Sequence, residues 1–193
     1  MNGILERVTR LVAELRTLGY TFRCPTAVLP GPSGDVEAQL AEVRALVGPI
    51  PPVLADFYRT VGSIDLTGHH SGWVGCDYPD PLVVEPIESV LDEARQFAGL
   101  NDPLHEYWGS DSGTFRAPIA PDAIHKAGES GGMWYGVEIP SRTSDPVVLE
   151  EPHRLPLSVY LELSLYWGGF PGLERSAAHT WPLEALRRAA RAG

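Results

Sequence analysis

The order of helix-like and strand-like segments constrains the fold of this chain more than any other feature of its sequence. Apolar residues recur at three- and four-residue steps over residues 3–18, 35–47, 53–61 and 87–97, which is the spacing of one buried helix face. Short apolar runs bounded by glycine and proline lie between and after these segments, and they are typical of short strands. This order predicts an α+β fold with a central, mostly antiparallel sheet of short strands packed by helices.

The second half of the chain holds most of the expected strands and two further helices. A strongly apolar helix is expected over 157–167, and Thr180 and Pro182 are placed like the N-cap and first-turn proline of a helical extension over 180–192. No linker or internal repeat divides the chain, so we predict a single domain over residues 1–193. The expected strands are 20–22, 63–66, 72–75, 81–84, 115–120, 133–139 and 146–149.

Charge narrows the classes of partner. The chain carries 25 acidic and 15 basic residues, a formal net charge of −10, which opposes binding to nucleic acid or to an anionic membrane surface. An acidic field would steer a basic protein towards the chain, but the same charge also keeps a protein soluble without any partner. Residues 1–10 lack the apolar core of a secretion signal and no stretch has the apolar length of a membrane span, so a cytoplasmic location is expected.

One stretch is more one-sided in charge than the rest. From Asp65 to Asp92 the chain contains no lysine or arginine. We predict that this stretch forms an acidic partner-binding surface with aromatic anchors; a solvated acidic face is the alternative for any single residue. The candidate partner-binding residues are Asp65, Trp73, Asp77, Tyr78, Asp80, Glu85, Glu88 and Asp92.

Residues 128–132 read Gly-Glu-Ser-Gly-Gly and come directly before an apolar aromatic stretch. Backbone amides of such a loop could cradle an anion. We favour a tight turn that leads into the strand over 133–139, because glycine supplies the positive φ that such turns require. The candidate structural residues of this loop and of the turn after the 53–61 helix are Gly62, Gly128, Glu129, Gly131, Gly132 and Trp134.

No motif for catalysis or cofactor binding is present. No serine lies in a GxSxG elbow, and neither a Walker sequence nor GxGxxG appears. His69, His70, Cys76 and Asp77 form one cluster of metal-binding residue types, but they lack the paired spacing of zinc sites, and adjacent histidines of an extended chain point in opposite directions. We therefore expect no metal, no cofactor and no enzymatic activity.

Two segments resemble the SUKH superfamily, bacterial immunity-protein domains that share their fold with a yeast cell-wall assembly regulator. Residues 50–62, IPPVLADFYRTVG, resemble the proline-led helix of the family, with Val-Gly where the family typically has Asn-Gly. Residues 119–138, IAPDAIHKAGESGGMWYGVE, resemble its pattern of proline, short spacer, acidic glycine-rich turn and aromatic strand. A strand and a helix then follow in the expected order, so the resemblance covers about residues 35–170.

The resemblance implies an α+β domain without catalytic residues whose members bind and neutralise a toxin, often a nuclease or a deaminase. The expected partner is therefore a protein, such as a basic nuclease toxin, to which the acidic charge would be suited. A regulatory or scaffold module of the same fold that binds housekeeping proteins is the alternative. A small enzyme or metalloprotein is a third reading, for which the chain offers no clustered motif.

Overall fold

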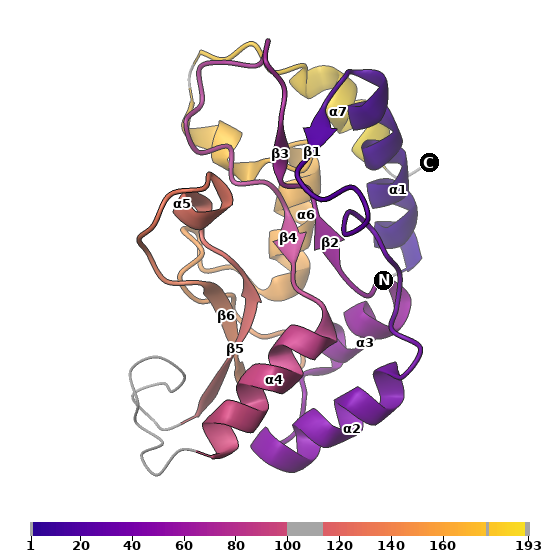
Figure 1. Cartoon of the computed structure of the whole chain (residues 1–193), viewed down its shortest axis with the longest axis vertical. Helices are drawn as coiled ribbons and strands as arrows, with labels where there is room; N and C mark the ends of the chain where they lie inside the picture. Colours follow the sequence, from indigo (N-terminus) through magenta and orange to yellow (C-terminus); the bar gives the residue numbers. More distant parts are fainter. Residues whose placement is uncertain (1, 100–113, 177, 192–193) are drawn as a thin grey trace.

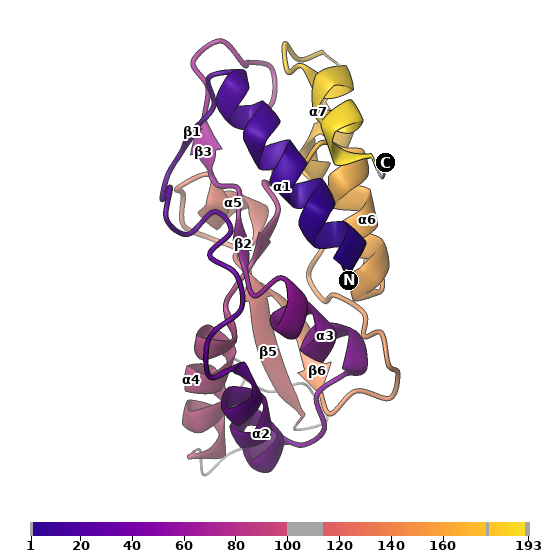
Figure 2. The same ribbon diagram turned by 90° about the vertical axis from the view of Figure 1, so that its right-hand side faces the viewer.

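The computed structural model describes residues 2–99, 114–176 and 178–191, and it has the α+β fold that the sequence predicts. Figures 1 and 2 show two groups of helices: α1, α6 and α7 lie together in one half of the molecule, and α2, α3 and α4 in the other. The helices of the described ranges are α1 (Asn2–Thr17), α2 (Val36–Val47), α3 (Pro52–Thr60), α4 (Ile87–Ala98), α5 (Ala123–Lys126), α6 (Leu157–Tyr166), the 3-10 helix η1 (Pro171–Arg175) and α7 (Leu183–Ala190).

The strands pair into antiparallel ladders of two strands each, β1 with β3, β2 with β4 and β5 with β6. A backbone hydrogen bond joins the last two ladders, because the amide of Glu85, directly after β4, donates to the carbonyl of Ile119 in β5 at 2.7 Å. Pro86 and Pro118 have no amide hydrogen to extend the pairing, so the sheet consists of short linked ladders. The strands are β1 (Thr21–Phe22), β2 (Ile64–Asp65), β3 (Gly68–His69), β4 (Val83–Val84), β5 (Phe115–Ala120) and β6 (Tyr135–Ile139).

Apolar residues from both helical groups and from the ladders meet in one core. In α1, Val8, Leu11 and Leu15 are fully buried, as their three- and four-residue spacing predicts. In β5, Ala117 and Ile119 alternate with less buried neighbours and face the same core. No helix in the described ranges is both long enough and apolar enough to cross a bilayer.

The C-terminal segment packs against the N-terminal helix. Leu186 of α7 is fully buried. The side chains of Arg7 and Arg10 in α1 donate to the carbonyls of Ala190 and Ala189, at 2.7 and 3.2 Å. These carbonyls belong to the last turn of α7, where helical partners are missing, so the arginines of α1 stabilise the end of α7.

The strand predicted over residues 72–75 is wrong, because β3 lies before it and these residues form a turn. The hydroxyl of Thr180 accepts the amide of Val74 at 2.8 Å and donates to the carbonyl of Gly72 at 2.7 Å. Two hydrogen bonds from a distant segment therefore hold this turn. The predicted N-cap role of Thr180 is also wrong, since α7 begins at Leu183 and its cap makes no side-chain hydrogen bond.

Two further elements differ from the sequence-based expectation. Residues 146–149 contribute only isolated bridges, such as the one between Leu149 and Gly136, rather than a strand. The short helix α5 was not expected from the sequence. Asp122 caps it, since one oxygen of its carboxylate accepts the amides of Ile124 at 2.8 Å and of the residue after it at 3.3 Å.

Candidate functional site

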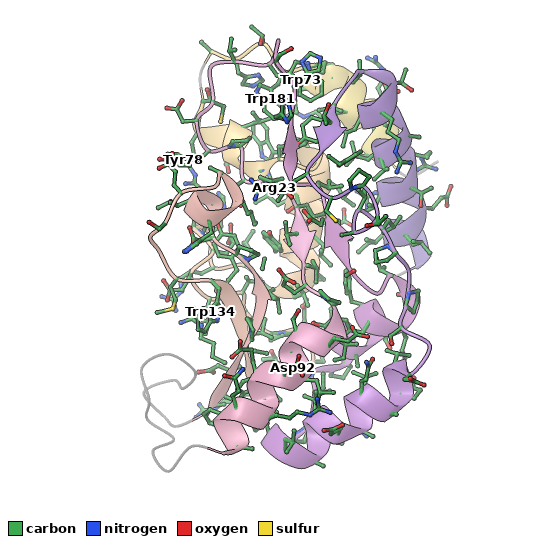
Figure 3. All side chains as sticks on the ribbon, in the orientation of Figure 1. Arg23, Trp73, Tyr78, Asp92, Trp134 and Trp181 are labelled. Atoms are coloured by element: carbon green, nitrogen blue, oxygen red, sulfur yellow. The ribbon has the colours of Figure 1, made fainter. Side chains whose placement is uncertain are left out.

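The candidate partner-binding residues do not form one surface. The acidic stretch runs from β2 through a loop and β4 into α4, and Figure 3 shows Trp73 at one end of the molecule, Tyr78 near α5 and Asp92 on α4 in the other half. Asp65 in β2 is half-buried, and its carboxylate accepts the amide of Thr67 at 2.8 Å. The prediction of one continuous acidic face is therefore wrong, because the stretch crosses the core between its ends.

Asp80 is buried, with 1% of its surface exposed, so its predicted place on a partner-binding surface is wrong. Its carboxylate accepts hydrogen bonds from Lys126 Nζ at 2.7 Å and from the Tyr135 hydroxyl at 3.0 Å. Lys126 is the single lysine of the chain and is itself buried. An acidic residue in a stretch without lysine or arginine can thus be paired with a cation that lies 46 residues away in the sequence.

A groove of about 800 Å³ lies between α4 and the β5–β6 ladder. Glu85, Asp92 and Glu93 line it, and no lysine or arginine among the described residues does, so we call it the acidic groove. Gly132 and Trp134 also line it. The acidic groove therefore joins members of the two candidate sets that the sequence kept apart. Its lining further includes Ser89, Gln96, His125 and Met133.

The carboxylates of the acidic groove differ in their surroundings. Glu85 is half-buried, and this burial raises its pKa above the ordinary glutamate value, although the Ser89 hydroxyl donates to it at 3.3 Å. Asp92 is exposed and forms an ion pair with Arg95 at 3.1 Å. The groove thus contains one carboxylate whose charged form is poorly solvated and which a cation from a partner would stabilise.

His125 also lines the groove, and its Nδ1 contacts the carboxylate of Asp122. Burial opposes ionisation of Asp122, but hydrogen bonds from the ring and the amide of His125 and from the amide of Ile124 outweigh it and lower its pKa. A histidine–carboxylate pair can move a proton for a nucleophile. The serine of the described lining, Ser89, donates to Glu85 instead, so the groove does not assemble a nucleophile with its base.

The glycines of loop 128–132 have the backbone that the sequence predicts. Gly128, Gly131 and Gly132 have φ values of 90°, 137° and 80°. A Cβ added to Gly132 would lie 2.8 Å from the carboxyl carbon of Asp122, whereas one added to Gly131 would meet nothing within 4 Å. A carboxylate beside Gly132 would repel an anion, which favours the tight turn over the anion cradle.

The other candidate structural residues lie in three different places. Glu129 accepts the hydroxyl of Tyr78 at 3.0 Å, so the glycine-rich loop and the acidic stretch touch outside the groove. Gly62 has a φ of 85°, and a Cβ there would clash with the carbonyl oxygen of Gly31. Trp134 is half-buried and lines the acidic groove, as Figure 3 places it beside β6.

The remaining candidates lie elsewhere. Glu88 is on α4 outside the acidic groove and accepts Gln39 Nε2 of α2 at 2.9 Å. A second cavity of about 550 Å³ lies among β1, β3, the loop after β3 and α5; we call it the aromatic cavity, because the indoles of Trp73 and Trp181 line it. In the described ranges no group of three His, Cys, Asp or Glu side chains could hold a metal ion. The cluster that suggested a metal lines the aromatic cavity: His69, His70, Cys76 and Asp77.

Sequence reasoning missed several groove residues, although α4 carried a signal for them. The groove residues of this segment recur at helical spacing, so they share one polar face beside the buried face of α4. Asp122 directly after Pro121 is the pattern of an N-cap and would have placed His125 in a short helix. The wall from β5 and β6 had no such signal, because it depends on how the strands pack against α4. The missed residues of α4 are Ser89, Glu93 and Gln96.

The fold and the groove together define an α+β protein with an acidic groove that Met133 and Trp134 also line. No protein-family model matches the chain, and comparisons with curated proteins and with solved structures found no match.

Proposed function

We propose that this chain is a non-catalytic protein-binding domain that holds a basic partner in the acidic groove. The observation that carries the proposal is the lining of the groove, where Glu85, Asp92 and Glu93 lie with Trp134 and Met133 and without lysine or arginine among the described residues. Aromatic and methionine side chains are enriched at protein interfaces. Complementary charge speeds the encounter with a partner and suppresses wrong partners.

Neutralisation of a toxin is the form of this function that the sequence resemblance favours. Residues 119–138 carry half of the resemblance to the SUKH superfamily, and the same segment supplies one wall of the acidic groove. A nuclease toxin holds the phosphates of its substrate on a basic surface. An acidic groove could cover that surface and exclude the substrate, which requires no catalysis by this chain.

The proposal is tested on the product of a toxin-like reading frame sought beside the gene for this chain. Binding is followed by stopped-flow over a salt series, for the wild type and for a variant with Glu85→Gln, Asp92→Asn and Glu93→Gln. The association rate of the wild type should fall as salt screens the charges. The variant should associate roughly tenfold or more slowly at low salt and depend less on salt.

A control variant carries the same change in net charge on the other half of the molecule, with Glu6, Glu14 and Glu184 of α1 and α7 changed to glutamine. It should associate at nearly the wild-type rate. Equal effects of the two triple variants would mean that only net charge matters, and the groove would be rejected as the binding site. If the groove variant instead loses binding to a housekeeping protein and the toxin does not bind, the regulatory or scaffold reading replaces the immunity role.

A further inference from the structure

The aromatic cavity lies away from the acidic groove, where β1 and β3 approach the C-terminal segment (Figure 3). Its volume of about 550 Å³ is that of a site for a small molecule. The proposed function does not use it. Its lining combines the aromatic rings of Phe22, Trp73 and Trp181 with polar side chains such as those of Arg23 and Asp77, and apolar rings with placed polar groups are typical of such sites.

The aromatic wall is built before any ligand arrives. The ring of Trp73 stacks on Tyr20 at 5.5 Å and on His70 at 4.6 Å, with interplanar angles of 26° and 28°. Trp181 lies 4.9 Å from Trp73 and 4.7 Å from Phe170. Because each indole is held by its neighbours, a planar ligand would meet a rigid wall and would lose little affinity to side-chain ordering.

One donor of this wall is left without a partner. The indole Nε1 of Trp181 is buried, and no acceptor within the described part of the chain is in reach of it. Buried indole N–H groups usually have a hydrogen-bond partner, so Trp181, a residue that lines the cavity, carries an unsatisfied donor.

Arg23 supplies a fixed cation at the same cavity. Its Nη2 donates to the carbonyl of Lys126 at 2.9 Å, which anchors the guanidinium beside α5. No carboxylate of the described ranges lies within ion-pair distance of it, in a chain that carries ten more acidic than basic residues. Asp77 is the one acidic residue of the described lining. An arginine that is anchored and not ion-paired presents a planar donor group that matches a carboxylate.

We propose that the aromatic cavity binds a small planar aromatic carboxylate, with its ring against Trp73 and Trp181 and its carboxylate at Arg23. The aromatic wall favours a ligand with a planar aromatic ring, and the anchored guanidinium favours a ligand with a carboxylate. The carboxylate of Asp77 would repel the carboxylate of the ligand and thereby weaken its binding.

The probe for this site is 1-naphthoate, and its neutral amide, 1-naphthamide, is the matched control ligand. Binding is measured by calorimetry and by the indole N–H signals in NMR spectra, in which that of Trp181 should move. Arg23→Gln should weaken binding of 1-naphthoate roughly tenfold, the scale of one hydrogen bond between charged groups. Arg23→Lys should retain part of the affinity, Asp77→Asn should strengthen it several-fold, and 1-naphthamide should respond to none of these changes.

Arg23 also holds a backbone carbonyl, so the melting temperature of each variant is measured first. If Arg23→Gln unfolds, Asp77→Asn and the comparison of the two ligands still test the charge argument. The proposal is overturned if 1-naphthoate does not bind the wild type at millimolar concentration. It is also overturned if the acid and the amide bind alike, or if the Trp181 signal stays in place while another indole moves.

Discussion

The buried ion pair between Lys126 and Asp80 should control the stability of the fold. In Lys126→Met the Asp80 carboxylate would lose its cation while 2% of its side chain is exposed. Removal of one partner from a buried pair costs about 3–5 kcal/mol, because the other charge stays buried without compensation. The Tyr135 hydroxyl still donates to Asp80 at 3.0 Å, so we expect the lower end, about 3 kcal/mol.

Two further variants make this expectation specific. Arg59→Met removes ion pairs of 2.6 Å to Glu37 and 3.5 Å to Asp56, but Arg59 is 36% exposed and the two carboxylates are 69% and 61% exposed, so it should cost at most about 1 kcal/mol. The double variant Asp80→Asn/Lys126→Met removes both buried charges, and asparagine tolerates the φ of 51° at this position. It should therefore be more stable than Lys126→Met alone.

The free energy of unfolding is measured by urea titration at constant pH, with the slope of the transition checked for each variant. The reasoning is refuted if Lys126→Met and Arg59→Met lose similar amounts of stability. It is equally refuted if the double variant is no more stable than Lys126→Met, since the penalty would then not come from an uncompensated charge.

Three more predictions concern the loop, pH and metal. Gly132→Ala should lose about 1 kcal/mol or more and melt below Gly131→Ala, because both have positive φ but only the Cβ at Gly132 meets a carboxylate; equal melting temperatures would contradict this. The hydrogen bond with Glu151 raises the pKa of His153, so its contribution to stability is present below about pH 6.5 and lost as pH rises through the folded-state pKa. His153→Gln should make the urea midpoint depend less on pH between about pH 5.5 and about pH 8. Purified protein should carry no stoichiometric zinc after dialysis, which elemental analysis checks.

Local periodicity was enough to locate the main helices. The segment 53–61 is α3, Pro52–Thr60, because a proline is tolerated in the first turn and a glycine with positive φ follows the last. The errors fall where a distant partner decides the conformation. Residues 72–75 form a turn because the hydroxyl of Thr180 binds two of their backbone groups, and no pattern within the segment encodes that contact.

The site was predictable only in part for the same reason. Charge sign is visible in a sequence, but the place of each charge in the fold is not, so Asp80 and Glu85 looked alike and differ completely. Asp80 is paired with a buried lysine. Glu85 is half-buried, accepts the Ser89 hydroxyl, and is attracted by Lys126 without forming an ion pair with it. The different environments of Asp80 and Glu85 result from strand pairing and from the packing of α4 against β5, and both depend on contacts between distant parts of the chain.

The burial of Glu85 distinguishes the acidic groove from an acidic surface that serves only solubility. A carboxylate in a solvated acidic face is fully hydrated and does not oppose folding, and exposure of Asp92 alone would not distinguish the groove from such a face. Glu85 lines the same groove with its pKa raised by burial, so its charged form opposes the stability of the isolated protein. Features that conflict with folding tend to lie at functional sites. A basic side chain of a partner placed beside Glu85 would remove the conflict, which is why the groove, rather than the longer acidic stretch, is the surface that supports a binding function.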